Sequence, residues 1–130
     1  MLIRFMIYGL AGWTMEILWT GAASLLRGDF MLKSSTSLWM FLIYGSAVFL
    51  EPVFAVLENS PVVLRGGLYM LFIFLAEFAT GTLLQKTAGC PWDYSSSRYS
   101  INGLIRLDYA PVWFAVGMIF EKIYFVFKGI

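Results

Sequence analysis

The chain has 130 residues, of which 60% are hydrophobic and only 13% are charged. Soluble domains carry about 25% charged residues, so this composition excludes a water-soluble globular domain and predicts an integral membrane protein. The net charge of +1 argues against a nucleic-acid partner. One cysteine and no histidine exclude an intramolecular disulfide and the usual zinc, haem and catalytic-triad arrangements, so neither a metal nor a cofactor is expected.

Four apolar segments approach the length of about 20 residues that crosses a bilayer. They cover residues 3–26, 38–57, 66–84 and 110–127. Lipid offers the backbone no hydrogen-bond partners, and segments this long and uniformly apolar do not suit barrel strands, so we expect helices. The sequence therefore predicts an all-α integral membrane fold, in which a single domain, residues 1–130, forms an antiparallel bundle of four transmembrane helices.

The first segment carries small residues and one acid on a single helical face. Gly9, Gly12, Glu16 and Thr20 recur at steps of three or four residues. Small residues let a neighbouring helix approach closely, so we expect Glu16 to point into a seam between helices. An acid inside this segment also argues against a cleaved signal peptide.

The second segment has Tyr44 and Glu51 on one face, and Pro52 follows directly. Proline has no N–H, so the carbonyl of Val48 loses its helical donor. We therefore expect a kink beside Glu51.

The third segment repeats the pattern of an acid and a small residue on one face, with Glu77 and Thr80. The connection after it, residues 85–109, is polar and aromatic, and a loop this long in a small protein is usually functional or disordered. Aromatic rings prefer the headgroup level or a packed cap. Trp92 and Tyr94 therefore predict a structured loop.

Asp93 in this loop has two interpretations that the sequence leaves open. It can form an Asx-turn by accepting from the amide of Ser95 or Ser96. Alternatively, the loop is a lid whose Asp93 reaches Arg98 or Arg106 above the acids of the membrane segments.

A faint internal repeat suggests duplication of a two-helix hairpin, which would give two halves of the same topology. Glu121, next to Lys122 and near a helix end, is interpreted as an interface residue that extends toward the headgroups. The matched residues are Glu16 with Glu77, Gly21 with Gly81, Trp39 with Trp113, Gly45 with Gly117, and Glu51 with Glu121.

Two of the acids are expected at the same depth. At helical rise, Glu16 and Glu77 lie roughly 20 and 17 Å from the side of the termini, beneath the long loop. Two carboxylates in a low-dielectric seam cannot both ionise easily, so we expect a proton or a cation there. The alternative is that each glutamate pairs with a hydroxyl or an arginine and only fastens the bundle. The predicted binding residues are Glu16, Tyr44, Glu51, Glu77, Thr80, Trp92, Asp93, Tyr94, Arg98, Asn102 and Arg106.

Residues 39–121 resemble a known membrane family through three strings. The strings are Leu75-Ala76-Glu77-Phe78-Ala79-Thr80-Gly81, Cys90-Pro91-Trp92-Asp93-Tyr94-Ser95 and Leu107-Asp108-Tyr109. With them the chain resembles the transmembrane protein 229 family, which is similar to bacterial membrane proteins labelled ABC-transporter type IV permeases. The resemblance implies four helices and a bacterial cell membrane, and it brings no established activity.

The leading hypothesis is a small permease-like protein that handles a cation, a proton-coupled solute or a lipid headgroup. Four helices rarely enclose a solvated path alone, so we expect a homo-oligomer or a partner membrane subunit in the bilayer. Two alternatives remain: a membrane enzyme acting on a lipid, with Glu77 and Asp93 as acid–base groups, and an accessory or scaffold subunit. Lys and Arg divide almost evenly between the two sides, so the positive-inside rule does not fix the orientation.

Overall fold

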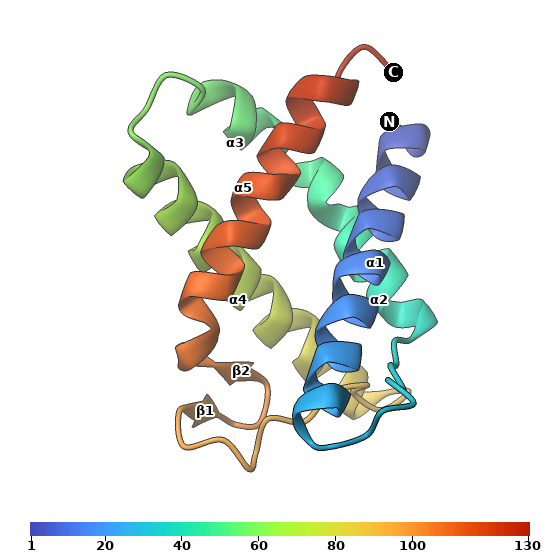
Figure 1. Cartoon of the computed structure of the whole chain (residues 1–130). Helices are drawn as coiled ribbons and strands as arrows, with labels where there is room; N and C mark the ends of the chain where they lie inside the picture. The colour runs from blue at the N-terminus through green and yellow to red at the C-terminus, as the bar shows by residue number, and fades with distance from the viewer. The chain divides into compact units, whose positions relative to one another are not determined.

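The computed structural model describes all 130 residues and consists of helices and one short hairpin (Figure 1). The chain divides into two compact units, residues 1–50 with 127–130, and residues 51–126. The elements in chain order are α1 (Leu2–Leu26), α2 (Leu38–Gly45), η1 (Ser46–Leu50), α3 (Glu51–Val56), α4 (Val62–Lys86), β1 (Ser100–Ile101), β2 (Ile105–Arg106), η2 (Leu107–Tyr109) and α5 (Ala110–Phe127).

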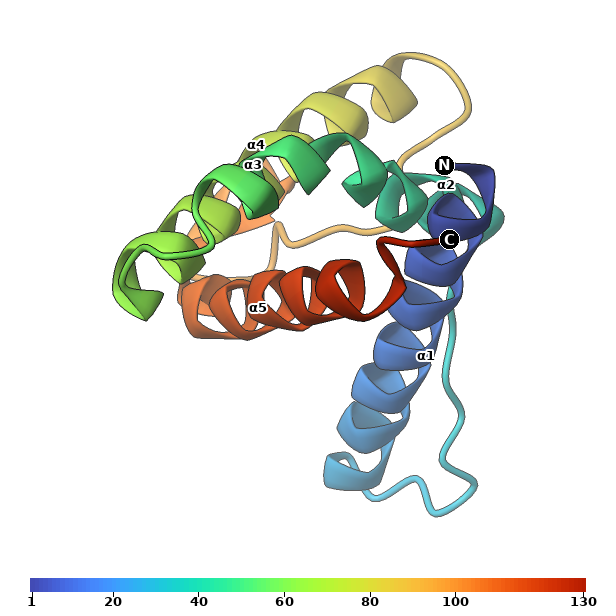
Figure 2. The ribbon, with the colours of Figure 1, turned by 90° about the horizontal axis from the view of Figure 1, so that it is seen from above.

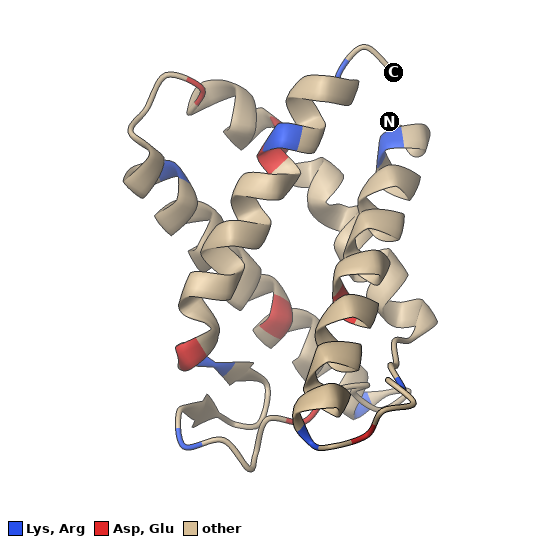
Figure 3. Ribbon diagram, viewed as in Figure 1, with Lys and Arg blue, Asp and Glu red and all other residues tan.

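Three helical stretches are long and apolar enough to cross a membrane, namely Leu38–Val56, Val62–Lys86 and Leu107–Phe127. Most charged residues lie at helix ends or in connections, as expected for such segments (Figure 3). The 25 residues of α1 are sufficient in length, but α1 is not among the three stretches that are both long and apolar enough. The helical fold and the membrane character predicted from the sequence are therefore confirmed, and a membrane span by α1 stays a prediction.

The second apolar stretch is interrupted where the sequence predicts a kink. The α-helix α2 ends at Gly45, a 3₁₀ turn covers Ser46–Leu50, and α3 starts at Glu51. Pro52 cannot donate to the carbonyl of Val48, and the tighter 3₁₀ turn occupies the residues on its N-terminal side. The interruption leaves Glu51 as the first residue of a new helix, where it is buried.

In the unit of residues 1–50, α1 packs against α2, and the connection between them folds back along α1 (Figures 1 and 2). Several hydrogen bonds hold the connection there, and in one of them the hydroxyl of Ser24 donates to the carbonyl of Lys33. Trp13 Nε1 donates to the carbonyl of Ser37 at 2.9 Å, and the amide of Ser35 donates to Thr20 Oγ1 at 3.0 Å. Some backbone N–H and C=O groups of the connection therefore find hydrogen-bond partners among the side chains of α1.

In the unit of residues 51–126, α4 and α5 approach closely through glycines. A Cβ atom at Gly66 would lie 2.2 Å from the ring of Phe114, and one at Gly117 would lie 2.4 Å from Cβ of Tyr69. Tyr69 is 1% exposed and makes an edge contact with Phe54, with ring centroids 4.9 Å apart. The core of this unit is therefore aromatic, with glycines as the sites of contact.

The connection between α4 and α5 is structured, as its aromatic residues predict. Strands β1 and β2 form an antiparallel hairpin that pairs Ser100 with Arg106. Its turn contains Asn102 and Gly103, whose φ angles are +55° and +70°. Positive φ at both positions is the backbone of a type I′ turn, for which Asn-Gly is the preferred sequence.

Candidate functional site

Glu77 is a buried carboxylate of α4 that receives a hydrogen bond from the following loop. Its side chain is 7% exposed, and the hydroxyl of Tyr94 donates to its Oε2 at 3.1 Å. Glu77 lies nine residues before the end of α4 at Lys86, which corresponds to roughly 14 Å at helical rise. Tyr94 therefore reaches from the loop to an acid well inside the helix.

A glycine on the same face of α4 seats the loop. A Cβ atom at Gly81 would lie 2.7 Å from Leu104 Cδ2 and 3.1 Å from Trp92 Cζ2. Trp92 Nε1 donates to the carbonyl of Leu104 at 2.9 Å, and the amide of Tyr94 donates to the carbonyl of Gly103 at 2.9 Å. These contacts hold the loop against Gly81, which follows Glu77 by four residues and therefore lies one helical turn away on the same face. Tyr94 is thereby placed within reach of Glu77.

Asp93 forms the Asx-turn, and the alternative in which it reaches an arginine is wrong. Its Oδ1 accepts from the amide of Ser95 at 2.9 Å. The pKa of Asp93 is lowered from its ordinary value, mainly because the side chain of Ser95 also donates to it. Arg106 pairs with Asp108 instead, so Asp93 shapes the loop.

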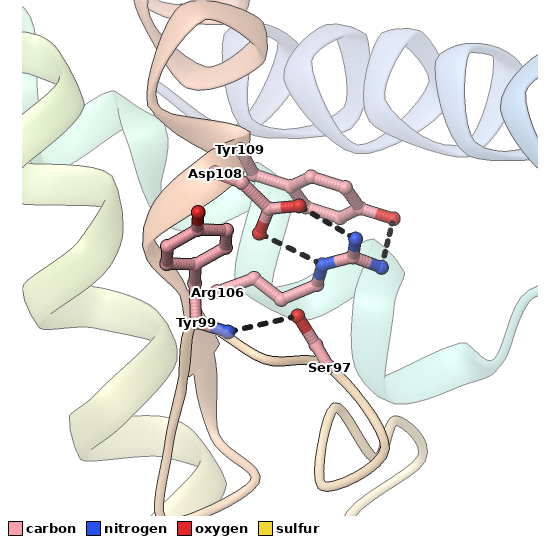
Figure 4. A network of polar contacts seen from close by, with 5 residues as sticks. All are labelled: Ser97, Tyr99, Arg106, Asp108 and Tyr109. Carbon is pink, nitrogen blue, oxygen red and sulfur yellow. Dashed lines mark hydrogen bonds and ion pairs between the residues drawn. The ribbon is translucent and has the colours of Figure 1, made fainter.

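Arg106 is the centre of a polar network at the start of α5 (Figure 4). Its guanidinium donates twice to Asp108, with Nη2 2.7 Å from Oδ2 and Nε 3.0 Å from Oδ1. It also lies over the ring of Tyr109, 4.3 Å from the centroid. The pKa of Arg106 is raised above its ordinary value, chiefly by the hydrogen bond to Asp108.

An aromatic series joins this network to Glu77. The ring of Tyr109 makes an edge contact with Tyr94 at 5.6 Å and another with Trp113 at 6.2 Å. Edge-to-face pairs of this kind add roughly 0.5–1.5 kcal/mol beyond the burial of their area. Tyr94, which donates its hydroxyl to Glu77, is thus held by edge-to-face aromatic contacts as well as by the loop backbone.

Glu16 has a comparable hydroxyl partner in the other unit. The side chain of Glu16 is half-buried, and the hydroxyl of Tyr44 donates to its Oε2 at 3.1 Å. The ring of Tyr44 lies on Gly12, where a Cβ atom would come within 2.0 Å of Cγ. The seam predicted for Glu16 is therefore the contact of α1 with α2.

A third glutamate, Glu121 of α5, forms a site that the sequence analysis missed. It is 7% exposed, and its Oε2 accepts from the hydroxyl of Tyr69 and lies 3.3 Å from Nε of Arg65. The interpretation of Glu121 as an interface residue is therefore wrong. The signal that could have found it is Gly117, which precedes Glu121 by four residues as Gly12 precedes Glu16.

Three other predicted residues, Thr80, Arg98 and Asn102, do not gather at Glu77. The hydroxyl of Thr80 donates to the carbonyl of Ala76 at 2.6 Å, within the helix. Arg98 is exposed and lies 5.7 Å from the centroid of Tyr99, and Asn102 is in the hairpin turn. Cys90 is not one of the predicted residues. Its Sγ would lie 3.7 Å from a Cβ atom at Gly81, and burial raises the pKa of its thiol.

The predicted pairing of Glu16 with Glu77 joins residues of different units and stays a prediction. Glu51 is buried at 7% exposure, and its role as a binding residue also stays a prediction. Within single units, the structure brings together Glu77 with Tyr94 and Trp92, and Glu16 with Tyr44.

This chain is similar to a known protein family over nearly its whole length. It matches the family described as “Putative ABC-transporter type IV” over residues 3–128. The chain belongs to this family. No solved structure matches it. The match extends the resemblance seen in residues 39–121 to nearly the full length, and together with the three apolar helices it identifies a membrane protein of a transporter-type family.

Proposed function

We propose that this protein is a permease-type membrane protein in which Glu77 is the carboxylate that binds a proton or a cation during transport. The observation that carries the proposal is the contact between Glu77 and Tyr94, because a loop side chain reaches a buried acid inside a membrane helix. Acids within membrane segments are costly and usually mark ion pathways or proton relays.

The hydrogen bond between Glu77 and Tyr94 links the charge of this acid to the loop. Tyr94 comes from the structured connection after α4, held on Gly81 through Trp92 and Leu104. A protonated carboxyl donates a hydrogen bond and an ionised one only accepts. A change in the charge of Glu77 therefore changes its interaction with Tyr94, and the loop is positioned to respond.

The proposal includes the finer features of the expected architecture. We propose that α1 crosses the membrane as a fourth span. One sequence feature supports a duplicated hairpin: Tyr8 precedes Glu16 by eight residues, as Tyr69 precedes Glu77. Both tyrosines are buried, with 0% and 1% of their surface exposed. A path through so few helices also favours an oligomer or a partner membrane subunit.

The second candidate is a membrane subunit of an ATP-driven transporter, which the family description favours. The sequence contains no glycine-rich loop of the type that cradles nucleotide phosphates. In this case a separate chain would supply ATP hydrolysis, and Glu77 would bind the solute.

The test is flux through vesicles that contain the purified protein. Proton influx is read with an entrapped pH dye under an imposed potential, and cation uptake is measured with labelled rubidium and guanidinium. We expect the wild type to give more flux than empty vesicles. The flux of Glu77→Gln should be at least roughly tenfold below that of the wild type, because the substituted amide cannot ionise. Glu58→Gln is the matched control, since Glu58 is an exposed glutamate of the connection before α4.

Equal flux for Glu77→Gln and the wild type would overturn the role of this carboxylate. No flux for the wild type alone, with flux restored by an added ATPase subunit, would favour the second candidate.

A further inference from the structure

Tyrosine, glycine and glutamate form the same local arrangement in two helix pairs of the chain. In the pair of α4 and α5, Tyr69 lies against Gly117, and its hydroxyl donates to Glu121, four residues further along α5. Arg65 precedes Tyr69 by one turn of α4 and places Nε 3.3 Å from the same carboxylate oxygen. This carboxylate therefore has both a hydroxyl and a cation from the opposite helix.

In the pair of α1 and α2, Tyr44 lies against Gly12, and its hydroxyl donates to Glu16, again four residues further along. The residue one turn before the tyrosine is now Met40, a half-buried side chain without charge. Both pairs are antiparallel, as the course of the ribbons shows (Figure 1). The position one turn before the tyrosine therefore lies toward the glutamate in each pair.

The difference between the two sites is a charge. An ionised carboxylate among apolar helices needs a nearby cation, or its desolvation is uncompensated. Arg65 meets this need for Glu121. Glu16 accepts hydrogen bonds from the hydroxyls of Tyr44 and Thr36 and forms no ion pair within the structure. The position that Arg65 occupies in one site therefore has no cationic side chain in the other.

We propose that Glu16 and Tyr44 bind a monovalent organic cation of the guanidinium or primary ammonium class. The cation occupies the position at Glu16 that the side chain of Arg65 occupies at Glu121. The guanidinium group of Arg65 thus makes with Glu121 the interaction that the free cation makes with Glu16.

The donor set at Glu16 favours an organic cation over a metal ion. Hard cations such as Ca²⁺ and Mg²⁺ take six or more oxygen ligands, whereas this site offers one carboxylate and the hydroxyls of Tyr44 and Thr36. Nowhere in the structure do three or more metal-ligating side chains gather. The aromatic ring of Tyr44 suits a weakly hydrated cation.

This inference deepens the proposed function, because the cation bound at Glu16 would be the transported solute or the coupling ion. Binding is measured without transport, so the two can fail separately. Binding without flux would overturn the permease and leave this site; flux without binding at Glu16 would overturn this site and leave Glu77.

The first experiment is calorimetric titration of the full chain in detergent with guanidinium chloride and with methylammonium chloride, at millimolar concentration. Potassium chloride of equal ionic strength is the reference. We expect saturable binding to the wild type and to Glu58→Gln, at least roughly tenfold weaker binding to Glu16→Gln, and an intermediate loss for Tyr44→Phe. Unchanged affinity in Glu16→Gln, or a response of the wild type that potassium chloride reproduces, would overturn the proposal.

The second experiment places an arginine at the Glu16 site and, in a separate variant, removes the arginine from the Glu121 site. Met40→Arg should abolish guanidinium binding and raise the melting temperature, while the size control Met40→Leu should keep the affinity of the wild type. Arg65→Ala should melt several degrees lower, and added guanidinium should restore part of that loss, except when Glu121→Gln is also present. Wild-type affinity in Met40→Arg, or no recovery of Arg65→Ala, would show that the two sites are not equivalent.

Discussion

The two buried glutamates at α4, Glu121 near its start and Glu77 in its second half, have partners of different origin. Near its start, Arg65 and Tyr69 both contact Glu121, and all three side chains come from the regular helices α4 and α5. Near its end, the helix itself supplies the acid, Glu77, and the hydroxyl comes from Tyr94 in a loop. The first arrangement is set by helix packing, and the second depends on how the loop is folded.

The comparison shows that a buried glutamate in a membrane helix does not by itself indicate a function. Glu121 has an internal cation and fastens α5 to α4, which is the alternative that the sequence left open for each acid. Glu77 interacts with a side chain of a loop and not of a packed helix, which suits the role that we propose for it in transport. The origin of the partner, helix or loop, separates the two roles.

The largest expected effect comes from breaking the ion pair at the start of α4. Arg65→Met should lower the free energy of unfolding by about 3 kcal/mol, because removing one partner leaves a buried charge uncompensated. Reversible unfolding in mixed micelles measures this value. The double variant Arg65→Met/Glu121→Gln should lose clearly less than the single one, since the isolated carboxylate is then gone.

That double-mutant cycle also tests the fastening role itself. If Arg65→Met and Glu121→Gln simply add, the two residues do not interact energetically and the contrast with Glu77 disappears.

A smaller effect is expected from the glycines that bring the partners together. Gly117→Ala should cost about 1–3 kcal/mol, because the new Cβ would lie 2.4 Å from Cβ of Tyr69, an atom fixed close to the backbone. Gly81→Ala should cost less, because its nearest neighbour is Leu104 Cδ2, the end of a flexible side chain. Unfolding midpoints of the two variants give the order directly.

Gly67→Ala is the matched control on α4, since no atom lies within 4 Å of the added Cβ. It should leave stability unchanged or raise it by about 0.5–1 kcal/mol through helix propensity. A cost at Gly81 as large as at Gly117 would mean that the loop is as rigid as the helix pair.

The helices could be predicted from the sequence because they depend on local apolar length. The stretch predicted at 110–127 has the bounds of α5, and Pro52 indicated the interruption before Glu51. The charge of Lys122 does not indicate the surroundings of Glu121, because adjacent residues of a helix point in different directions. The glycine one turn earlier decides its burial.

The contacts of the loop could be predicted only in kind. Aromatic residues indicated a folded segment, and the Asx-turn at Asp93 follows from local chemistry. That Tyr94 reaches Glu77 depends on the hairpin and on the seat at Gly81, which no local pattern specifies. Asn102 was chosen as a binding residue, yet Asn-Gly is the strongest short-range hairpin signal and was the better guide to its place in the structure.

The smallest expected effect is a pH dependence confined to the loop end of α4. The pKa of Asp93 is lowered because its carboxylate accepts from the side chain and the amide of Ser95. The folded loop therefore binds fewer protons than the unfolded one in the acid range. This stabilisation is complete above the ordinary pKa of an aspartate, about 4, and it is lost as the pH falls through the lowered pKa of the folded loop.

Exchange of the Ser95 amide, measured by NMR in detergent, should accelerate relative to its intrinsic rate only in that acidic range. Asp93→Asn keeps an acceptor for the amide, so its protection should be independent of pH, whereas Asp93→Ala should be unprotected throughout. The ion pair of Arg65 with Glu121 should be unaffected by either change, because it lies at the other end of α4. A simultaneous loosening of both ends in acid would mean that the helix responds as one body and that the loop has no separate freedom.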